Sequence, residues 1–346
     1  MEIETRRSFL FAVGGGVPLI LGAANKSGSA KPVIGSGAYT YEVTHDWGSL
    51  PPEIKYGNTH GVCQDSQGRI YIHHTVNALS ESSDSMVVFD EYGKFVKSWG
   101  KQFKGGAHGL HIRKEGSAEF LYLCDTKRGL MQKATLDGEE VFTLGYPTES
   151  EAYRPNPDGS AKKYSPTNLT IAPNGDIYIG DGYGSSYVNV YNSAGKYLRT
   201  FGGMGTEAGR LNCPHGIVLD SRGAEPILMI ADRGNHRIQT FTLAGAHLGF
   251  IEGANLPCYF DFSHSGETVV PDLGARVTLL DRNNKVIQHL GDDLAAHSWE
   301  TVRKLDRSAF QPGKFVCPHG ACFDRDGNIF VVEWVEVGRV TKLRRL

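Results

Sequence analysis

Four histidines stand at comparable places in this chain, and each is directly followed by a glycine. An imidazole nitrogen can bind a divalent transition metal, and it can transfer protons near neutral pH. A glycine lets the chain approach a central axis without side-chain crowding. A set of His-Gly pairs therefore indicates a metal or acid–base site where several strands converge. The pairs begin at His60, His108, His215 and His319.

The four pairs belong to a repeat of six units. Each unit opens with an apolar segment and continues through turn residues into further short strands. The opening positions are separated by 48, 59, 48, 43 and 61 residues. Periods of about 40–50 residues with four strands each are typical of propeller blades. We therefore predict an all-β, six-bladed β-propeller. The equivalent positions are His60, His108, Thr167, His215, Cys258 and His319.

Residues at equivalent positions of the first strands would form a ring, because this strand lines the central channel of a propeller. Three imidazoles from different blades fit a catalytic zinc site with a vacant fourth position. Iron or manganese would accept the same ligands with added waters. Histidines at strand starts can also merely satisfy backbone groups beside the channel. Their recurrence at four of six ring positions favours the metal interpretation, with Zn²⁺ or another divalent transition metal as the cofactor.

The ends of the chain predict how the propeller closes. The segment 39–44 alternates apolar and polar residues, and 339–343 supplies only the third strand of blade six. We expect these two segments to pair, which removes a free sheet edge. Two long connections interrupt the repeat. We expect residues 146–163 to cover one mouth of the channel and residues 292–313 to include a short helix at 298–305.

The first residues resemble a twin-arginine export signal, with Arg6 and Arg7 before a mildly apolar, glycine-rich run. The resemblance departs at Phe11, where a lysine is common. The run is short for a membrane span, although an uncleaved anchor is the alternative. We expect a folded, exported protein of the periplasm or the cell exterior, with no transmembrane domain after cleavage. The expected parts are the signal segment 1–30, a linker 31–37 and the propeller 38–346.

The amino-acid composition of the chain limits the kinds of partner that it can bind. The formal net charge is −2, from 36 basic and 38 acidic residues, so neither nucleic acid nor an anionic membrane is indicated. We expect a monomer with a small-molecule or peptide substrate in the central channel. Six cysteines occur without any CxxC spacing, which disfavours a thiolate zinc site of the finger type. Export permits disulfides, but we favour mostly free, buried thiols.

With these motifs in hand, the chain resembles the NHL-repeat propellers, and among them the catalytic domain of peptidyl-α-hydroxyglycine α-amidating lyase. The resemblance covers about residues 38–343. Segments 231–238 and 180–183 have forms that many NHL blades share. The more specific feature is a histidine in blades two, four and six, preceded by proline in the last two. The resemblance implies a single zinc ion with three protein ligands. The implied ligands are His108, His215 and His319.

The same resemblance implies two catalytic side chains. Tyr183 matches the proposed catalytic tyrosine of the lyase, and Arg233 matches an active-site arginine. A phenolate near a cation can take a hydroxyl proton while zinc polarises the same oxygen. Considered alone, Tyr183 is equally compatible with a packing aromatic, and Arg233 with a salt bridge in a blade turn.

This chain departs from the lyase pattern at several positions. His74 stands where the lyase has an arginine, and we count it as a candidate catalytic residue. Gly320 replaces an aspartate that helps to hold calcium, so structural Ca²⁺ is doubtful. Gly184 replaces a disulfide cysteine. His60 has no counterpart in the lyase and is a fourth candidate ligand. The resemblance to the lyase therefore supports the metal-binding histidines better than it supports the substrate chemistry.

Three functions fit these observations. The first is an exported metal-dependent lyase that cleaves the C–N bond of a peptidyl-α-hydroxyglycine-like substrate to an amide and glyoxylate. The second is an exported metalloenzyme of the same fold with another substrate, since His60 and His74 alter the channel. The third is a non-catalytic NHL propeller that binds a protein or peptide. A binding scaffold needs no ring of histidines, and this disfavours the third.

Overall fold

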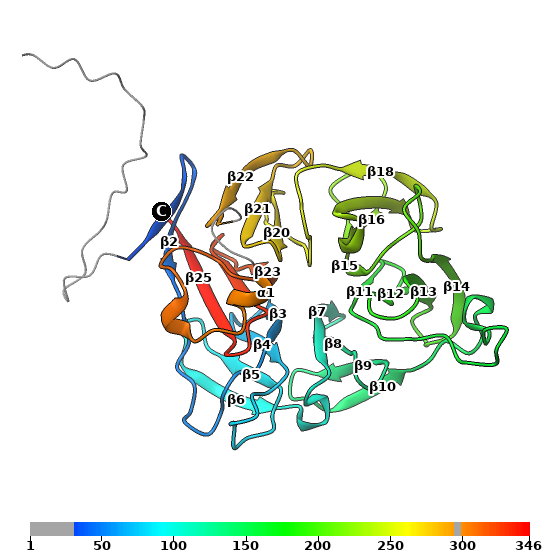
Figure 1. Ribbon diagram of the computed structural model, residues 1–346, viewed down its shortest axis with the longest axis horizontal. Helices are drawn as coiled ribbons and strands as arrows, with labels where there is room; N and C mark the ends of the chain where they lie inside the picture. Colours follow the sequence, from blue (N-terminus) through cyan, green and yellow to red (C-terminus); the bar gives the residue numbers. More distant parts are fainter. Residues whose placement is uncertain (1–30, 294–298) are drawn as a thin grey trace, which may run out of the picture.

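Six antiparallel sheets are arranged like blades around a central axis in the computed structural model, which describes residues 31–293 and 299–346 (Figure 1). This arrangement confirms the predicted six-bladed β-propeller. Within each blade the strands follow one another from the channel outward. The predicted export signal at 1–30 lies outside the described residues.

The strand bounds are as follows. Blade one holds β3 (Thr59–Gln64), β4 (Ile70–His74), β5 (Met86–Phe89) and β6 (Phe95–Trp99). Blade two holds β7 (Ala107–Glu115), β8 (Ala118–Asp125), β9 (Leu130–Thr135) and β10 (Glu140–Leu144). Blade three holds β11 (Asn168–Ile171), β12 (Ile177–Gly180), β13 (Tyr187–Tyr191) and β14 (Tyr197–Gly202). Blade four holds β15 (Pro214–Asp220), β16 (Ile227–Asp232), β17 (Arg237–Thr242) and β18 (His247–Ile251). Blade five holds β19 (Asp261–Phe262), β20 (Thr268–Asp272), β21 (Arg276–Leu280) and β22 (Val286–Leu290).

Blade six joins the two ends of the described chain. It contains β23 (Pro318–Phe323), β24 (Ile329–Glu333) and β25 (Arg339–Arg345), and β2 (Tyr39–Thr44) pairs with β25. The expected closure by an N-terminal strand is therefore present. The expected linker at 31–37 needs correction, because β1 (Val33–Ser36) adds a fifth strand beyond β2. This strand forms because a turn at Gly37 folds the segment back onto β2.

The core lies between neighbouring blades. Successive side chains of a strand point to opposite faces of its sheet. On β4, Ile70 and Ile72 therefore pack toward blade six, whereas Tyr71 packs toward blade two. The same alternation occurs in every blade, so apolar clusters lie between each pair of neighbours. These interfaces fix the inner strands relative to one another, and the inner strands carry the ring positions.

The two long connections between blades differ in what their described residues contact. The connection 146–163 contains a 3₁₀ turn (Glu151–Tyr153), and Tyr153 donates a hydrogen bond of 2.7 Å to Asp181 of blade three. The connection 292–313 contains the helix α1 (Trp299–Val302), shorter than the expected 298–305, and a 3₁₀ turn (Arg307–Ala309). Its Arg303 accepts a backbone hydrogen bond of 3.0 Å from Glu336 of blade six.

Further 3₁₀ turns are Lys101–Phe103 and Arg233–Asn235. All six cysteines are free thiols, and only Cys213 among them is not fully buried, which agrees with the expectation from sequence. No helix in the described part of the chain is long and apolar enough to cross a membrane.

Candidate metal centre

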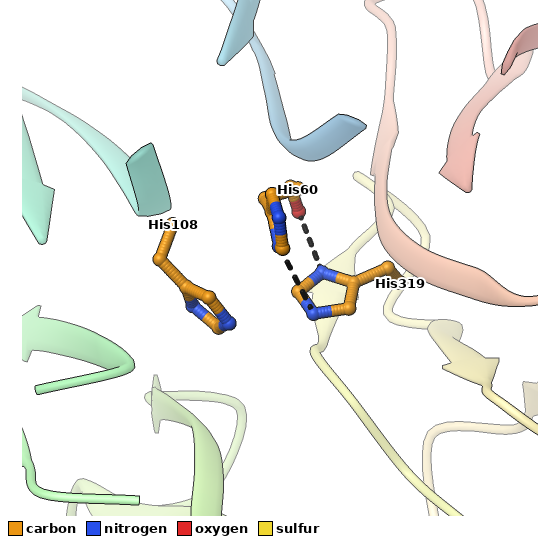
Figure 2. Close-up of side chains that lie close together, drawn as sticks. All are labelled: His60, His108 and His319. Carbon is orange, nitrogen blue, oxygen red and sulfur yellow. Dashed lines mark hydrogen bonds between the residues drawn. The ribbon is translucent and has the colours of Figure 1, made fainter. Parts of the chain in front are cut away.

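The four ring histidines meet at one end of the channel. They come from the start of β3, β7, β15 and β23, and all four side chains are buried. Figure 2 shows three of these side chains converging from separate strands. The four rings therefore form one cluster. The ring centroids are separated by 4.5 Å for His60–His319, 4.6 Å for His60–His108 and His215–His319, 4.8 Å for His108–His215 and 4.9 Å for His108–His319.

Three of these histidines share one orienting contact. In each, Nδ1 lies at hydrogen-bond distance from the carbonyl oxygen of the ring residue in the next blade. Because a carbonyl oxygen only accepts, Nδ1 must carry the proton and Nε2 must hold a lone pair. This tautomer is the one that binds a metal through Nε2. The contacts are His108–Thr167 (2.7 Å), His215–Cys258 (2.8 Å) and His319–His60 (3.0 Å).

The glycine after each of these histidines makes the contact possible. A Cβ atom added at Gly109 would lie 2.5 Å from the Thr167 carbonyl oxygen, and one at Gly216 would lie 2.5 Å from the Cys258 carbonyl oxygen. Gly320 shows the same restriction, with 2.6 Å to the carbonyl oxygen of the next ring residue. The same carbonyl groups therefore orient the imidazoles and exclude a side chain at the following position. This explains the His-Gly pairs of the sequence in physical terms.

A second ring, of buried acids, holds the chain where it enters the inner strands. Asp232 accepts a hydrogen bond of 2.6 Å from the Asn212 backbone N–H, three residues before His215. Glu333 accepts one of 2.7 Å from the Val316 N–H, three residues before His319. Arginines in the following strands, such as Arg237, balance these charges. Each acid ends the second strand of its blade or, for Asp181, directly follows it. The members are Asp125, Asp181, Asp232, Asp272 and Glu333.

This ring of acids was not predicted from the sequence, although the repeat contains the pattern that indicates it. Every second strand from blade two to blade six reaches an acid at its end, and blade one has His74 instead. His74 Nδ1 accepts a hydrogen bond of 3.1 Å from the Val76 N–H, and its ring packs edge-on against Tyr56. Among the described residues, no contact joins His74 to the four clustered histidines. The structure therefore does not bring this candidate catalytic residue to the site. In blade one, His74 occupies the position that an acid occupies in the other five blades.

His60 differs from the other three ring histidines. Its Nδ1 lies 3.3 Å from Nε2 of His319, as Figure 2 shows. Since His319 Nε2 is an acceptor, His60 Nδ1 must be the donor. Ligand-type atoms of His60, His108 and His319 all lie within 4.8 Å of one another, so proximity alone selects that trio. The shared carbonyl contact selects His108, His215 and His319 instead. We prefer the second set because tautomer and ring orientation are fixed there.

Burial keeps these imidazoles neutral. The pKa of His319 is lowered to about 3, mainly by burial; the hydrogen bond to the His60 carbonyl opposes this shift and the positive charge of Arg233 adds to it. Burial, followed by neighbouring charges, also lowers the pKa of His60, His108 and His215 well below the usual value. Neutral imidazoles are the form that binds a metal.

Tyr183 and Arg233 complete the site, as the sequence predicted for their location. The Tyr183 hydroxyl oxygen lies 3.2 Å from His108 Nε2 and 3.1 Å from His215 Nε2. Arg233 Nη2 donates to the same oxygen at 3.3 Å. Burial raises the pKa of Tyr183, and the positive charge of Arg233 partly offsets this. The hydroxyl is therefore neutral in the protein without a further cation.

The number of protons on Tyr183 and the neighbouring imidazoles indicates that these side chains suit a bound cation. Both Nε2 atoms beside Tyr183 are acceptors, yet the phenol has only one proton to donate. A divalent ion bound by the Nε2 atoms would satisfy the remaining lone pairs, and borderline ions such as Zn²⁺ favour imidazole. The residues present therefore fit the expected metal. Gly320 offers no carboxylate for Ca²⁺, and the described residues show no other group of three metal-ligand side chains.

Arg233 is a partly buried cation without a carboxylate partner among the described residues. Its other contacts are the thiols of Cys213 (3.4 Å) and Cys258 (3.8 Å). A buried guanidinium is costly to leave without an anion. Its position beside Tyr183 therefore suits a ligand that brings a carboxylate to the histidine cluster.

The fold and this cluster define a six-bladed β-propeller whose channel carries a histidine site at one end. No protein-family model matches the chain. The chain is similar to peptidyl-alpha-hydroxyglycine alpha-amidating lyase 1 of Drosophila melanogaster, with 26% identity over 332 residues, 85% of this chain and 58% of the relative. It is also similar to human NHL repeat-containing protein 3, with 29% identity over 197 residues, 55% of this chain and 53% of the relative.

This chain thus spans little more than half the length of these relatives. Solved structures support the fold alone. A gluconolactonase from Xanthomonas campestris superposes with a TM-score of 0.61 at 15% identity, covering 96% of this chain and 99% of that one.

Proposed function

We propose that this protein is an exported metalloenzyme that cleaves the C–N bond of a peptidyl-α-hydroxyglycine-like substrate. The observation that carries the proposal is the cluster in which the Nε2 atoms of His108 and His215 lie beside the Tyr183 hydroxyl, next to Arg233, which has no carboxylate partner among the described residues. His319 belongs to the same cluster and has the same orienting carbonyl contact as these two histidines. The similarity to amidating lyases over most of the chain supports the reaction class.

The proposed ligands are His108, His215 and His319. A divalent cation there would supply Lewis-acid polarisation of a substrate oxygen and positive charge that favours a Tyr183 phenolate. Arg233 would pair with the substrate carboxylate and fix its orientation. Tyr183 would take the hydroxyl proton of the substrate, since its oxygen lies among the histidines.

The bond changes balance without another reactant. The O–H bond of the α-hydroxyl group breaks and a C=O bond forms, while the C–N bond breaks and its electron pair goes to nitrogen. Tyr183 receives the hydroxyl proton, and one proton reaches the nitrogen. The products are an amide and glyoxylate, so neither oxidant nor water is consumed.

The test combines metal analysis with product analysis on protein purified without chelator. We expect a bound divalent metal and the release of glyoxylate from a peptidyl-α-hydroxyglycine. A metal-loaded protein that releases no glyoxylate would contradict the lyase reaction and leave the metalloenzyme class. A protein that binds no metal would contradict both.

A metalloenzyme with another substrate is the second candidate. The contact between His60 and His319 favours it, because this fourth histidine borders the site and has no counterpart in the lyase pattern. Screening ester, lactone and amide hydrolysis by the metal-loaded protein tests this candidate.

A further inference from the structure

A second cavity lies in the channel on the far side of the ring positions from the histidine site. Its volume is about 430 Å³, and its wall comes from the inner strands of blades one, two, four, five and six. Its exposed lining residues His264 and Arg325 show that it opens to solvent.

Tyr259 separates this cavity from the histidines. It occupies the position after the ring residue, where four of the other blades have glycine. The glycines at the equivalent positions leave room in the channel for the Tyr259 side chain. Its hydroxyl lies 3.5 Å from the Leu110 carbonyl oxygen of blade two. One tyrosine thus spans from blade five to blade two and lines the second cavity. The two ends of the channel are therefore separate sites.

The wall of the second cavity contains one carboxylate that the fold does not neutralise. Asp261 Oδ2 accepts a hydrogen bond of 2.7 Å from the Phe323 N–H of the next blade. Within the described chain, no lysine, arginine or histidine pairs with this carboxylate. The other acids of the lining have partners of their own: Asp65 pairs with Arg69, Glu119 bonds to Ser66 and Asp324 bonds to Asn328.

Blade three shows that this structural contact requires no charge. Thr170 stands three residues after its ring position, as Asp261 does in blade five. Its hydroxyl accepts the Leu219 N–H of the next blade at 3.1 Å. Thr170 thus makes the same inter-blade contact with a neutral group. Asp261 also accepts from the backbone N–H of Phe262, and neither N–H group carries a charge. The negative charge of Asp261 is therefore surplus to this structural role and is left for a ligand.

The surroundings of Asp261 indicate the kind of ligand. Val62, Val218 and Phe262 give the cavity an apolar wall. Burial raises the pKa of Asp261 to about 7, because the charged carboxylate is poorly solvated there. A bound cation would stabilise the charged form. Burial lowers the pKa of His111, on the opposite side, to about 4, so this imidazole is neutral and does not compete. The described residues around Asp261 include no group of three metal ligands, which disfavours a metal ion.

We propose that this second cavity binds a small organic cation, with a protonated primary amine on Asp261 and its apolar body against the wall. The site is independent of the metal centre and of the reaction proposed there. A volume of about 430 Å³ lies within the range of ligand pockets, about 300–1,000 Å³.

Isothermal titration calorimetry of the whole protein with benzylammonium tests the proposal, and benzyl alcohol is the neutral control of the same shape. We expect saturable binding of the amine at one site and none of the alcohol. Asp261→Thr copies blade three and should keep the inter-blade contact and the metal content. It should weaken amine binding about 10- to 100-fold, the value of a hydrogen bond to a charged group. Absence of saturable amine binding, or equal binding by the alcohol or by Asp261→Thr, overturns the proposal.

A measurement on the wild type covers the case in which Asp261→Thr does not fold. The carboxyl ¹³C resonance of Asp261 reports its protonation. Benzylammonium should lower the midpoint of this titration, because a bound cation favours the carboxylate. A midpoint that does not change with saturating amine contradicts the assignment of Asp261.

Discussion

Nδ1 of His215 lies 2.8 Å from the carbonyl oxygen of Cys258, the residue at the same ring position in the next blade. The same relationship holds at His108 and His319, in alternate blades. At these three positions, the inner strand of the next blade therefore orients the imidazole. The metal site depends on how closely neighbouring blades approach, and this leads to the first prediction.

Gly216→Ala should destabilise the protein and disturb the site. The added Cβ would lie 2.5 Å from the Cys258 carbonyl oxygen, the acceptor for His215. Overpacking of this kind costs about 1–3 kcal/mol of unfolding free energy. Urea denaturation and metal analysis measure the two effects. Gly145→Ala is the matched control, because nothing lies within 4 Å of its added Cβ. Equal stability of the two variants would contradict the close approach of the strands.

Tyr183→Phe should abolish most activity and leave the fold intact. The ring remains, but the hydroxyl that lies 3.1 Å from His215 Nε2 is lost. Loss of a general base predicts a fall in kcat of roughly 10²–10⁴-fold. Glyoxylate release measures kcat, and metal analysis checks that the ion is retained. Tyr197→Phe, in an outer strand, is the control and should be fully active. Wild-type activity of Tyr183→Phe would remove this residue from the mechanism.

Acid should destabilise the metal-free protein. Burial lowers the pKa of His319 and His74 to about 3 and of His73 to about 4, whereas unfolded histidine has a pKa of about 6.5. Below about 6.5 the unfolded chain therefore binds more protons, so the unfolding free energy falls as the pH falls, down to about 3. Urea denaturation with chelator at about pH 7.5 and about pH 5 tests this sign. An equal or larger unfolding free energy at the lower pH would show that these imidazoles are not buried.

The spacing of the six aligned strand openings was enough to predict six blades, and the four His-Gly pairs among them predicted the gathering of the ring histidines. The exact repetition of the ring position carries that information, because equivalent residues of a propeller face one axis. The different role of His60 was not predictable, since it depends on which nitrogen faces His319. The position of His74 was not recognised from the sequence. It corresponds to the acids at the ends of the other second strands, and this is visible only when all six second strands are aligned.

The strand β1 was missed for another reason. The segment 31–37 is short and contains two glycines, so its local sequence pattern predicted a linker. Pairing with β2 supplies the backbone hydrogen bonds that the local sequence does not encode. Asp261 was likewise unremarkable in the sequence, because the inner strand of blade five is only weakly similar to the others.

Export by the twin-arginine route depends on Arg6 and Arg7. Replacing both with lysine keeps the charge and removes the guanidinium pair. We expect the precursor to remain in the cytoplasm, whereas the wild type reaches the periplasm or the exterior. Cell fractionation followed by immunoblotting measures the distribution. Unchanged export of the double variant would indicate another route.

Metal content per chain tests the central claim most directly. We expect wild-type protein purified without chelator to hold about one divalent ion, because three imidazoles with fixed tautomers lie in one cluster. His108→Ala, His215→Ala and His319→Ala should each lose most of it, since each removes one of three protein ligands. His60→Ala is the matched control from the same ring, and it should retain the ion because His60 lacks the orienting carbonyl contact. A wild type without metal would contradict the account, and so would a His60→Ala variant that loses the ion as completely as His215→Ala.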